Sequence, residues 1–254
     1  MCRISSVNGR NGISSCDRMQ RLPVWIGAAH GLSALGEGVA AHVARMRSGG
    51  TALREWPAPA SKPLIAGRLP EALLPDGPHR LLDLCLTAML AEIAPLPNER
   101  WMLVLASTKG HIEALEHGDA SASALPLLGE HMRQRCGRIE PPVVISLACA
   151  SGTAALIHAC TAIEQGHCDH ALVVGIDVLS RFVLDGFASL YALDAVPCRP
   201  FDDKRAGTSL GEACAGQGDG SPERSPTMPT TSVVPRAPAK DCCAPCNGPC
   251  GKRL

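Results

Sequence analysis

Aromatic side chains are scarce in this sequence: Phe, Trp and Tyr make up 3% of its 254 residues. A core must therefore be built from aliphatic side chains, and a hydrophobic content of 46% supplies enough of them for a globular domain. The sequence also lacks a run of 18 apolar residues, which argues against a membrane span. Its N-terminal stretch has no apolar region of the kind found in secretion signals, so we expect a cytoplasmic protein.

An excess of charge of either sign is absent too, because 24 Lys and Arg residues balance 24 Asp and Glu residues. Nucleic-acid-binding proteins normally carry a basic stripe, and since none is visible we expect no nucleic-acid partner. Cysteine, in contrast, is abundant, with 13 residues. The odd number and irregular spacing disfavour a secreted disulfide framework. Several of these cysteines lie in apolar stretches, where cysteine packs as a small hydrophobic side chain.

The composition divides the chain into three zones. Residues 1–20 form a polar leader that we expect to be disordered, and residues 21–213 read as continuous α/β protein. Residues 214–254 are rich in Pro, Gly and Cys and poor in large apolar side chains, so we expect a disordered tail. The abrupt change after 213 suggests a shift of reading frame in the coding DNA.

Apolar patterning within 21–213 predicts alternating strands and helices, hence a mixed, mainly parallel sheet with helices on both faces. The expected strands lie within 22–32, 101–108, 141–148 and 169–179, and the expected helices within 36–49, 79–94 and 151–165.

Cys149 stands where a buried strand meets a helix of small residues. The unpaired N–H groups and the dipole at a helix N-terminus favour a thiolate and could stabilise an oxyanion. Its neighbours Ala150, Ser151 and Gly152 are too small to shield it. Position alone leaves two interpretations open, a nucleophile or a buried structural cysteine.

The motifs around Cys149 resemble the nucleophile region of the β-ketoacyl-acyl-carrier-protein synthases of the thiolase superfamily, of the elongating type. The matching pieces are A-C-A-S-G, I-E-Q-G, A-L-V-V-G-I-D, F-x-x-L-x-A-L and R-P-F-D-x-x-R-x-G-x-x-L-G-E, in that order. The resemblance covers about residues 22–213. It implies the N-terminal half of a thiolase-like layered fold.

The resemblance implies an acyltransferase that performs a decarboxylative Claisen condensation in fatty acid, polyene or polyketide elongation. Cys149 would be the nucleophile, and its backbone N–H an oxyanion donor. The implied partners are an acyl carrier protein, acyl and malonyl thioesters, and a second ketosynthase chain in a homodimer or heterodimer. No cofactor is implied.

The sequence departs from the family in its basic residues. Family members use two histidines and a lysine in His-Gly-Thr and Lys-x-x-x-Gly-His type motifs, and none of the nine histidines here lies in such a motif. We interpret His111 and His158 as surface or core-edge residues. The resemblance therefore implies a truncated synthase that can be acylated but does not complete condensation. The alternatives are a non-catalytic partner subunit of a complete ketosynthase and a non-functional product.

Two other functional interpretations are weaker. Cys243, Cys246 and Cys250 could bind zinc with Cys242, but one C-x-x-C pair without a well-spaced second pair is a poor zinc signal, so we expect no metal site. A hydrolase that uses Ser151 would require a G-x-S-x-G motif, which is absent. The charged residues of the segment 201–207, and Asp177, are interpreted as caps and pairs around turns.

Overall fold

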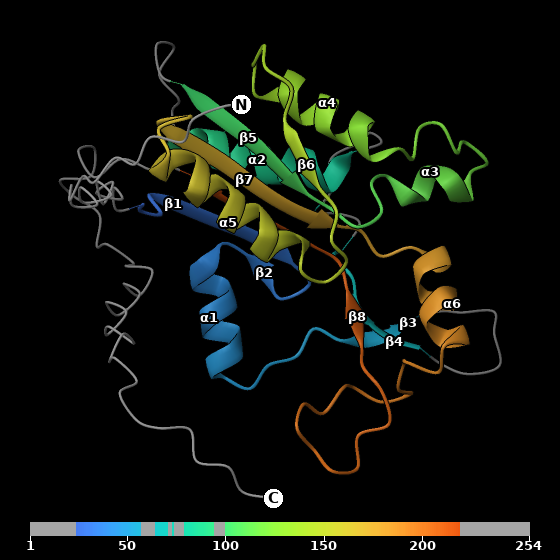
Figure 1. Ribbon diagram of the computed structural model, residues 1–254. Helices are drawn as coiled ribbons and strands as arrows, with labels where there is room; N and C mark the ends of the chain where they lie inside the picture. The colour runs from blue at the N-terminus through green and yellow to red at the C-terminus, as the bar shows by residue number, and fades with distance from the viewer. Residues whose placement is uncertain (1–23, 57–63, 71–72, 74–78, 94–99, 219–254) are drawn as a thin grey trace, which may run out of the picture.

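The computed structural model describes residues 24–56, 64–70, 73, 79–93 and 100–218 (Figure 1). The strands in this part of the chain are β1 (Ala28–Ser33), β2 (Gly36–Glu37), β3 (Arg54–Trp56), β4 (Leu64–Gly67), β5 (Trp101–Ala106), β6 (Val143–Ile145), β7 (His170–Asp177), β8 (Leu210–Gly211) and β9 (Ala213–Gly218). The helices are α1 (Val39–Arg47), α2 (Arg80–Ile93), α3 (Ile112–Glu116), α4 (Leu125–Arg135), α5 (Ser151–Glu164) and α6 (Arg181–Ser189).

The described strands form a larger sheet in the order β2-β1-β9-β7-β5-β6 and a smaller one in the order β3-β4-β8. In the larger sheet β5 pairs in parallel with β6 and β7, whereas β9 runs antiparallel between β7 and β1. It follows that β1, β5, β6 and β7 point in the same direction. The expected mixed sheet is confirmed for this part of the chain, but three of its five strand pairings, β2–β1, β1–β9 and β9–β7, are antiparallel, so it is not mainly parallel.

Helices α2 and α4 cover one face of the larger sheet. Leu82, Leu86 and Met89 of α2 are fully buried, and they share a core cluster with Met132 of α4 and with residues of β1, β5, β7 and β9. The hydrophobic side chains of α2 recur at helical spacing, which is why the sequence predicted this helix.

Helix α5 covers the opposite face, where it lies across the sheet in Figure 1. It contributes mainly small side chains, Ala155, Ala159 and Ala162, which pack against apolar residues of β5 and β7. Alanine favours the helical conformation and lets the helix approach the sheet closely. Both faces are therefore covered by helices, as expected.

The ends of several elements differ from the sequence-based ranges. The first strand begins at Ala28, later than the expected range, although Gly27 N still donates a hydrogen bond to Gly218 O at 3.0 Å. Helix α4 and strands β3, β4, β8 and β9 were not predicted. Among the described residues no helix is both long enough and apolar enough to cross a membrane.

Strand β9 corrects the expected domain boundary. We expected the ordered domain to end at 213 and a disordered tail to begin at 214, but residues 214–218 continue a strand in the middle of the sheet. Its small residues make room for α2: a Cβ on Gly216 would lie 2.8 Å from Met89 Cγ, and one on Gly218 would lie 2.3 Å from Ile93 Cδ1. The polar leader 1–20 and the rest of the expected tail, 219–254, lie outside the described residues.

Gly216→Ala should destabilise the fold because the new methyl group would enter the fully packed contact with Met89. Overpacking of this kind costs about 1–3 kcal/mol in the free energy of unfolding, which chemical denaturation can measure. Gly211→Ala is the matched control, since its Cβ would lie 3.5 Å from the nearest atom and make ordinary contacts. Equal stability of the two variants would contradict the packing of β9 against α2.

Candidate functional site

The loop between β6 and α5 forms a tight elbow that presents Cys149. Ala148 has a φ of 44°, in the left-handed region that non-glycine residues seldom adopt. The next residue, Cys149, is exposed, and α5 begins at Ser151 directly after Ala150. The thiol therefore lies on the surface at the N-terminus of a helix, where the Ala150 and Ser151 N–H groups donate within the elbow, to Leu147 O and Ala148 O.

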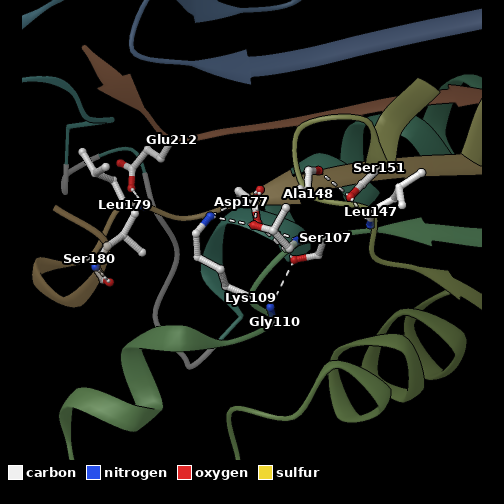
Figure 2. A network of polar contacts seen from close by, with 12 residues as sticks. Ser107, Lys109, Gly110, Leu147, Ala148, Ser151, Asp177, Leu179, Ser180 and Glu212 are labelled. Carbon is white, nitrogen blue, oxygen red and sulfur yellow. Dashed lines mark hydrogen bonds and ion pairs between the residues drawn. The ribbon is translucent and has the colours of Figure 1, made fainter. Parts of the chain in front are cut away.

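Ser151 fixes the shape of this elbow. Its Oγ accepts a hydrogen bond from Leu147 N at 2.8 Å and donates one to Ala148 O at 2.7 Å (Figure 2). The side chain is buried, with 5% of the residue exposed. The hydroxyl is therefore committed to the turn that carries Cys149. This placement agrees with the interpretation that Ser151 is not the nucleophile.

Asp177, the last residue of β7, organises the neighbouring turn. Its Oδ1 accepts hydrogen bonds from Ser107 Oγ at 3.2 Å and from Thr108 N at 3.0 Å, and its Oδ2 lies 3.6 Å from Lys109 Nζ (Figure 2). Thr108 Oγ1 also donates to this carboxylate at 2.8 Å. The expectation that Asp177 pairs around a turn is confirmed.

The Asp177 turn is joined to the strand before the elbow. Ser107 N donates a hydrogen bond to Ile145 O, the last residue of β6, at 3.2 Å, and Ser107 Oγ accepts one from Gly110 N. Parallel strands β5, β6 and β7 end at the same edge of the sheet, so the turn after β5, the elbow after β6 and Asp177 lie together there.

Glu212 holds the loops on the other side of Asp177 (Figure 2). Its two carboxylate oxygens accept hydrogen bonds from Leu69 N at 2.7 Å and Leu179 N at 3.2 Å. Burial raises the pKa of this carboxyl above its ordinary value. Glu212 ends the R-P-F-D to G-E motif, but its role was not predicted, because both of its partners are backbone groups distant in the sequence.

The two histidines singled out in the sequence stay apart from the thiol. His158 is exposed on α5, and His111 is half-buried just before α3. No hydrogen bond among the described residues joins either ring to Cys149. In the segment 201–207, Asp202 accepts a hydrogen bond from Lys204 N, as expected for a turn.

In the described part of the chain no three His, Cys, Asp or Glu side chains are arranged so that they could hold a metal ion. The weak zinc candidates Cys243, Cys246 and Cys250 lie outside the described residues, as does Cys242.

Residues 134–216, about a third of the chain, match the family described as beta-ketoacyl synthase, N-terminal domain. Triacetic acid lactone synthase cle1 of Aspergillus versicolor is 37% identical over 76 residues, which are 29% of this chain and 4% of that protein. Non-reducing polyketide synthase subA of Metarhizium robertsii is 39% identical over 79 residues, which are 30% of this chain and 4% of that protein.

Solved structures extend the likeness to most of the described fold. The ketosynthase ApeO, solved in complex with its chain length factor ApeC from Xenorhabdus doucetiae, has a TM-score of 0.67 and 24% identity, over 79% of this chain and 59% of that chain. A beta-ketoacyl synthase from Burkholderia phymatum has a TM-score of 0.63 and 23% identity, over 78% of this chain and 59% of that chain. The chain thus spans under two thirds of these structures and about 4% of the curated relatives. The expected thiolase-like fold, N-terminal part, is confirmed.

Ser151→Ala should loosen the elbow, because Leu147 N loses its hydrogen-bond acceptor and the Ala148 carbonyl loses a donor. We expect a loss of about 1–3 kcal/mol in the free energy of unfolding, measured by denaturation. Thr153→Ala is the control, since this hydroxyl residue is exposed on the same helix and should change stability by under about 0.5 kcal/mol. Equal stability of the two variants would contradict the hypothesis that the Ser151 hydroxyl holds the elbow in shape.

Proposed function

We infer that this chain, whose residues 134–216 belong to the β-ketoacyl synthase N-terminal domain family and whose fold is that of the ketosynthases, uses Cys149 as an acyl-accepting nucleophile. The observation that carries this proposal is the exposed thiol on a strained elbow at the N-terminus of α5. Other cysteines of the fold, such as Cys85 and Cys214, are fully buried and serve packing.

The proposed first step is thioester exchange. The Cys149 thiolate attacks the carbonyl carbon of an acyl thioester, and the carbonyl oxygen becomes an oxyanion that backbone N–H groups at the elbow, including that of Cys149, stabilise. When the tetrahedral intermediate collapses, the carbon–sulfur bond to the donor breaks, the sulfur of the donor leaves as a thiolate, and the acyl group remains on Cys149. We propose an acyl carrier protein as the donor. The step uses no metal or cofactor.

The proposed second step is condensation. A malonyl thioester loses carbon dioxide, its carbanion attacks the acyl carbon, and Cys149 leaves as a thiolate, which gives a 3-oxoacyl thioester. The histidines and the lysine that the family uses here have no counterpart in this sequence. We therefore propose that this chain carries out the acylation step. Condensation then requires residues supplied by another polypeptide segment.

The substrate class is narrowed by the relatives. Those reported above are a triacetic acid lactone synthase and a non-reducing polyketide synthase, so polyketide elongation is the pathway we propose first. Fatty acid and polyene elongation use the same chemistry and are separated from it by the acyl group that the thiol accepts.

A second candidate function is that of a non-catalytic partner subunit. One of the similar structures, ApeO with ApeC, is a ketosynthase solved in complex with its chain length factor. Leu147 and Ile157, which lie near Cys149 in the sequence, are large apolar residues with 59% and 62% of their surface exposed, and a partner chain would cover them favourably. The retention of Cys149 favours the catalytic candidate, because a partner subunit does not need a nucleophile.

Incubation with an acyl N-acetylcysteamine thioester should add one acyl group to the protein, and peptide mapping by mass spectrometry should place it on Cys149. We expect Cys149→Ala to lose at least about 90% of this label, in keeping with the need for a thiol nucleophile. Cys160→Ala is the matched control: this residue is exposed on the same helix, but partial burial of its thiol and the nearby Glu164 raise the pKa of the thiol, which lowers its reactivity. The control variant should keep the label.

Two outcomes separate the candidates. Equal labelling of Cys149 and Cys160 would show that any exposed cysteine reacts with the thioester, without activation by the elbow. This result would contradict the catalytic proposal. No acylation of a folded protein whose Cys149 is still alkylated by iodoacetamide would also contradict it and would favour the partner subunit.

A further inference from the structure

Three histidine rings from three separate elements meet on the α2 side of the sheet. His79 directly precedes α2, His111 directly precedes α3, and His131 lies in α4. The ring centroids of His79 and His131 are 4.3 Å apart, and those of His79 and His111 are 4.8 Å apart. His79 thus touches both other rings, and the three join helices that are far apart in the sequence.

The surrounding charges are unevenly distributed around the cluster. His131 Nε2 lies 2.8 Å from Asp83 Oδ1, and the same oxygen lies 2.9 Å from Arg135 Nε. The Asp83 carboxylate, which contacts His131, is therefore already shared with Arg135. His111 has Glu113, His117 and Asp119 near it.

The cavity beside His79 and His111 is lined on its charged side by Arg68, Arg80, Glu113 and Glu212. Glu212 accepts hydrogen bonds from two backbone N–H groups, as described above. A proton on His79 would meet the neighbouring His131 and His111, with the Asp83 carboxylate as the opposing charge.

The surroundings of His79 do not stabilise a positive charge on its ring. Its Nδ1 is buried and has no hydrogen-bond partner in the described part of the chain. Burial, and then the neighbouring His131 and His111, lower the pKa of His79 from 6.5 to about 4, and burial also lowers the pKa of His111. The closed cluster therefore requires a neutral His79. An opened cluster, in which the ring reaches water, would accept a proton near pH 6.5.

The cluster is connected to the candidate site through one turn. His111 follows Gly110, whose N–H donates to Ser107 Oγ, and Ser107 in turn donates to Asp177. Gly110 has a φ of 64°, and a Cβ there would lie 2.5 Å from Ser123 O, so this turn has little freedom to adjust. A displacement of His111 must therefore disturb the turn that holds Asp177.

We propose that His79, His111 and His131 form an acid-sensitive latch, which holds the turn between β5 and α3 in place while His79 is neutral and releases it when His79 is protonated. The sign follows from linkage: a group whose pKa is lowered in the closed state stabilises that state above the open-state value of 6.5. The stabilisation is lost progressively as the pH falls from 6.5 toward about 4.

Amide hydrogen exchange of the full chain, followed by NMR at about pH 7.5 and about pH 5, tests the latch. After correction for intrinsic exchange rates, the protection of the Gly110 and His111 amides should fall by about tenfold or more at the lower pH, as expected for local opening. The protection of Val173 and Val174 in the centre of β7 should stay within about twofold, which excludes global unfolding. Acylation is not measured, so this outcome is independent of the proposed function.

His79→Gln should markedly weaken the pH dependence, because the amide cannot be protonated in this range and only His111, whose pKa burial also lowers, still contributes to it. His158→Gln is the matched control, since it removes an exposed histidine outside the cluster. The ring protons of His79 in the unmodified protein give a second measurement that needs no variant: they should titrate well below pH 6.5. The latch is overturned by unchanged protection of Gly110 and His111 at the lower pH, by the same loss in His79→Gln, or by a His79 ring that titrates near pH 6.5.

Discussion

Strand β9 is the constraint on which the rest of the fold depends. It pairs with β1 over six residues on one side and with β7 over six residues on the other. The first described strand therefore joins the sheet only through the last one, and β2 joins only through β1. Contacts between the two ends of the described chain must form before the core beneath α2 is complete. Such non-local pairing makes folding slow and cooperative.

The same arrangement sets the position of the site. Strands β5, β6 and β7 are fixed in register by their parallel pairing. Their carboxyl ends therefore place the Ser107 turn, the Cys149 elbow and Asp177 at the same edge of the sheet. Backbone and side-chain hydrogen bonds then tie these segments together, with Asp177 and Ser151 as the acceptors that shape the two loops. The chemistry at the elbow thus relies on a rigid sheet rather than on the loop itself.

Local signals in the sequence predicted the elements that carry their own pattern. Helix α2 and strands β5 and β7 have apolar residues at the spacing of their structure, and the change from β-branched to small residues at Cys149 predicted the elbow. Strand β9 was missed because its glycines are explained only by Met89 and Ile93 of α2, which lie over a hundred residues away. The contacts of Glu212 and the histidine cluster were missed for the same reason.

The burial of the cysteines distinguishes those that pack in the core from the one that we propose as the nucleophile. Cys85 and Cys214 are fully buried between α2 and β9, where burial raises the pKa of Cys214 and keeps it a thiol. Cys149 has the opposite environment, exposed at a helix start with a left-handed residue before it. Strain at one residue of a tight turn persists only where the surrounding bonds enforce it, and here Ser151 supplies those bonds.

This local construction explains why the two halves of the proposed reaction can be separated. Thioester exchange needs a sulfur nucleophile and N–H donors, and we propose that the elbow supplies both within a few residues of one another. Decarboxylation needs positioned basic groups, but the histidines that cluster in this fold lie under α2 and α4, in contact with one another and with Asp83. We propose that a chain with this elbow and this histidine placement holds an acyl group, and that the second step depends on groups brought to the same sheet edge from elsewhere.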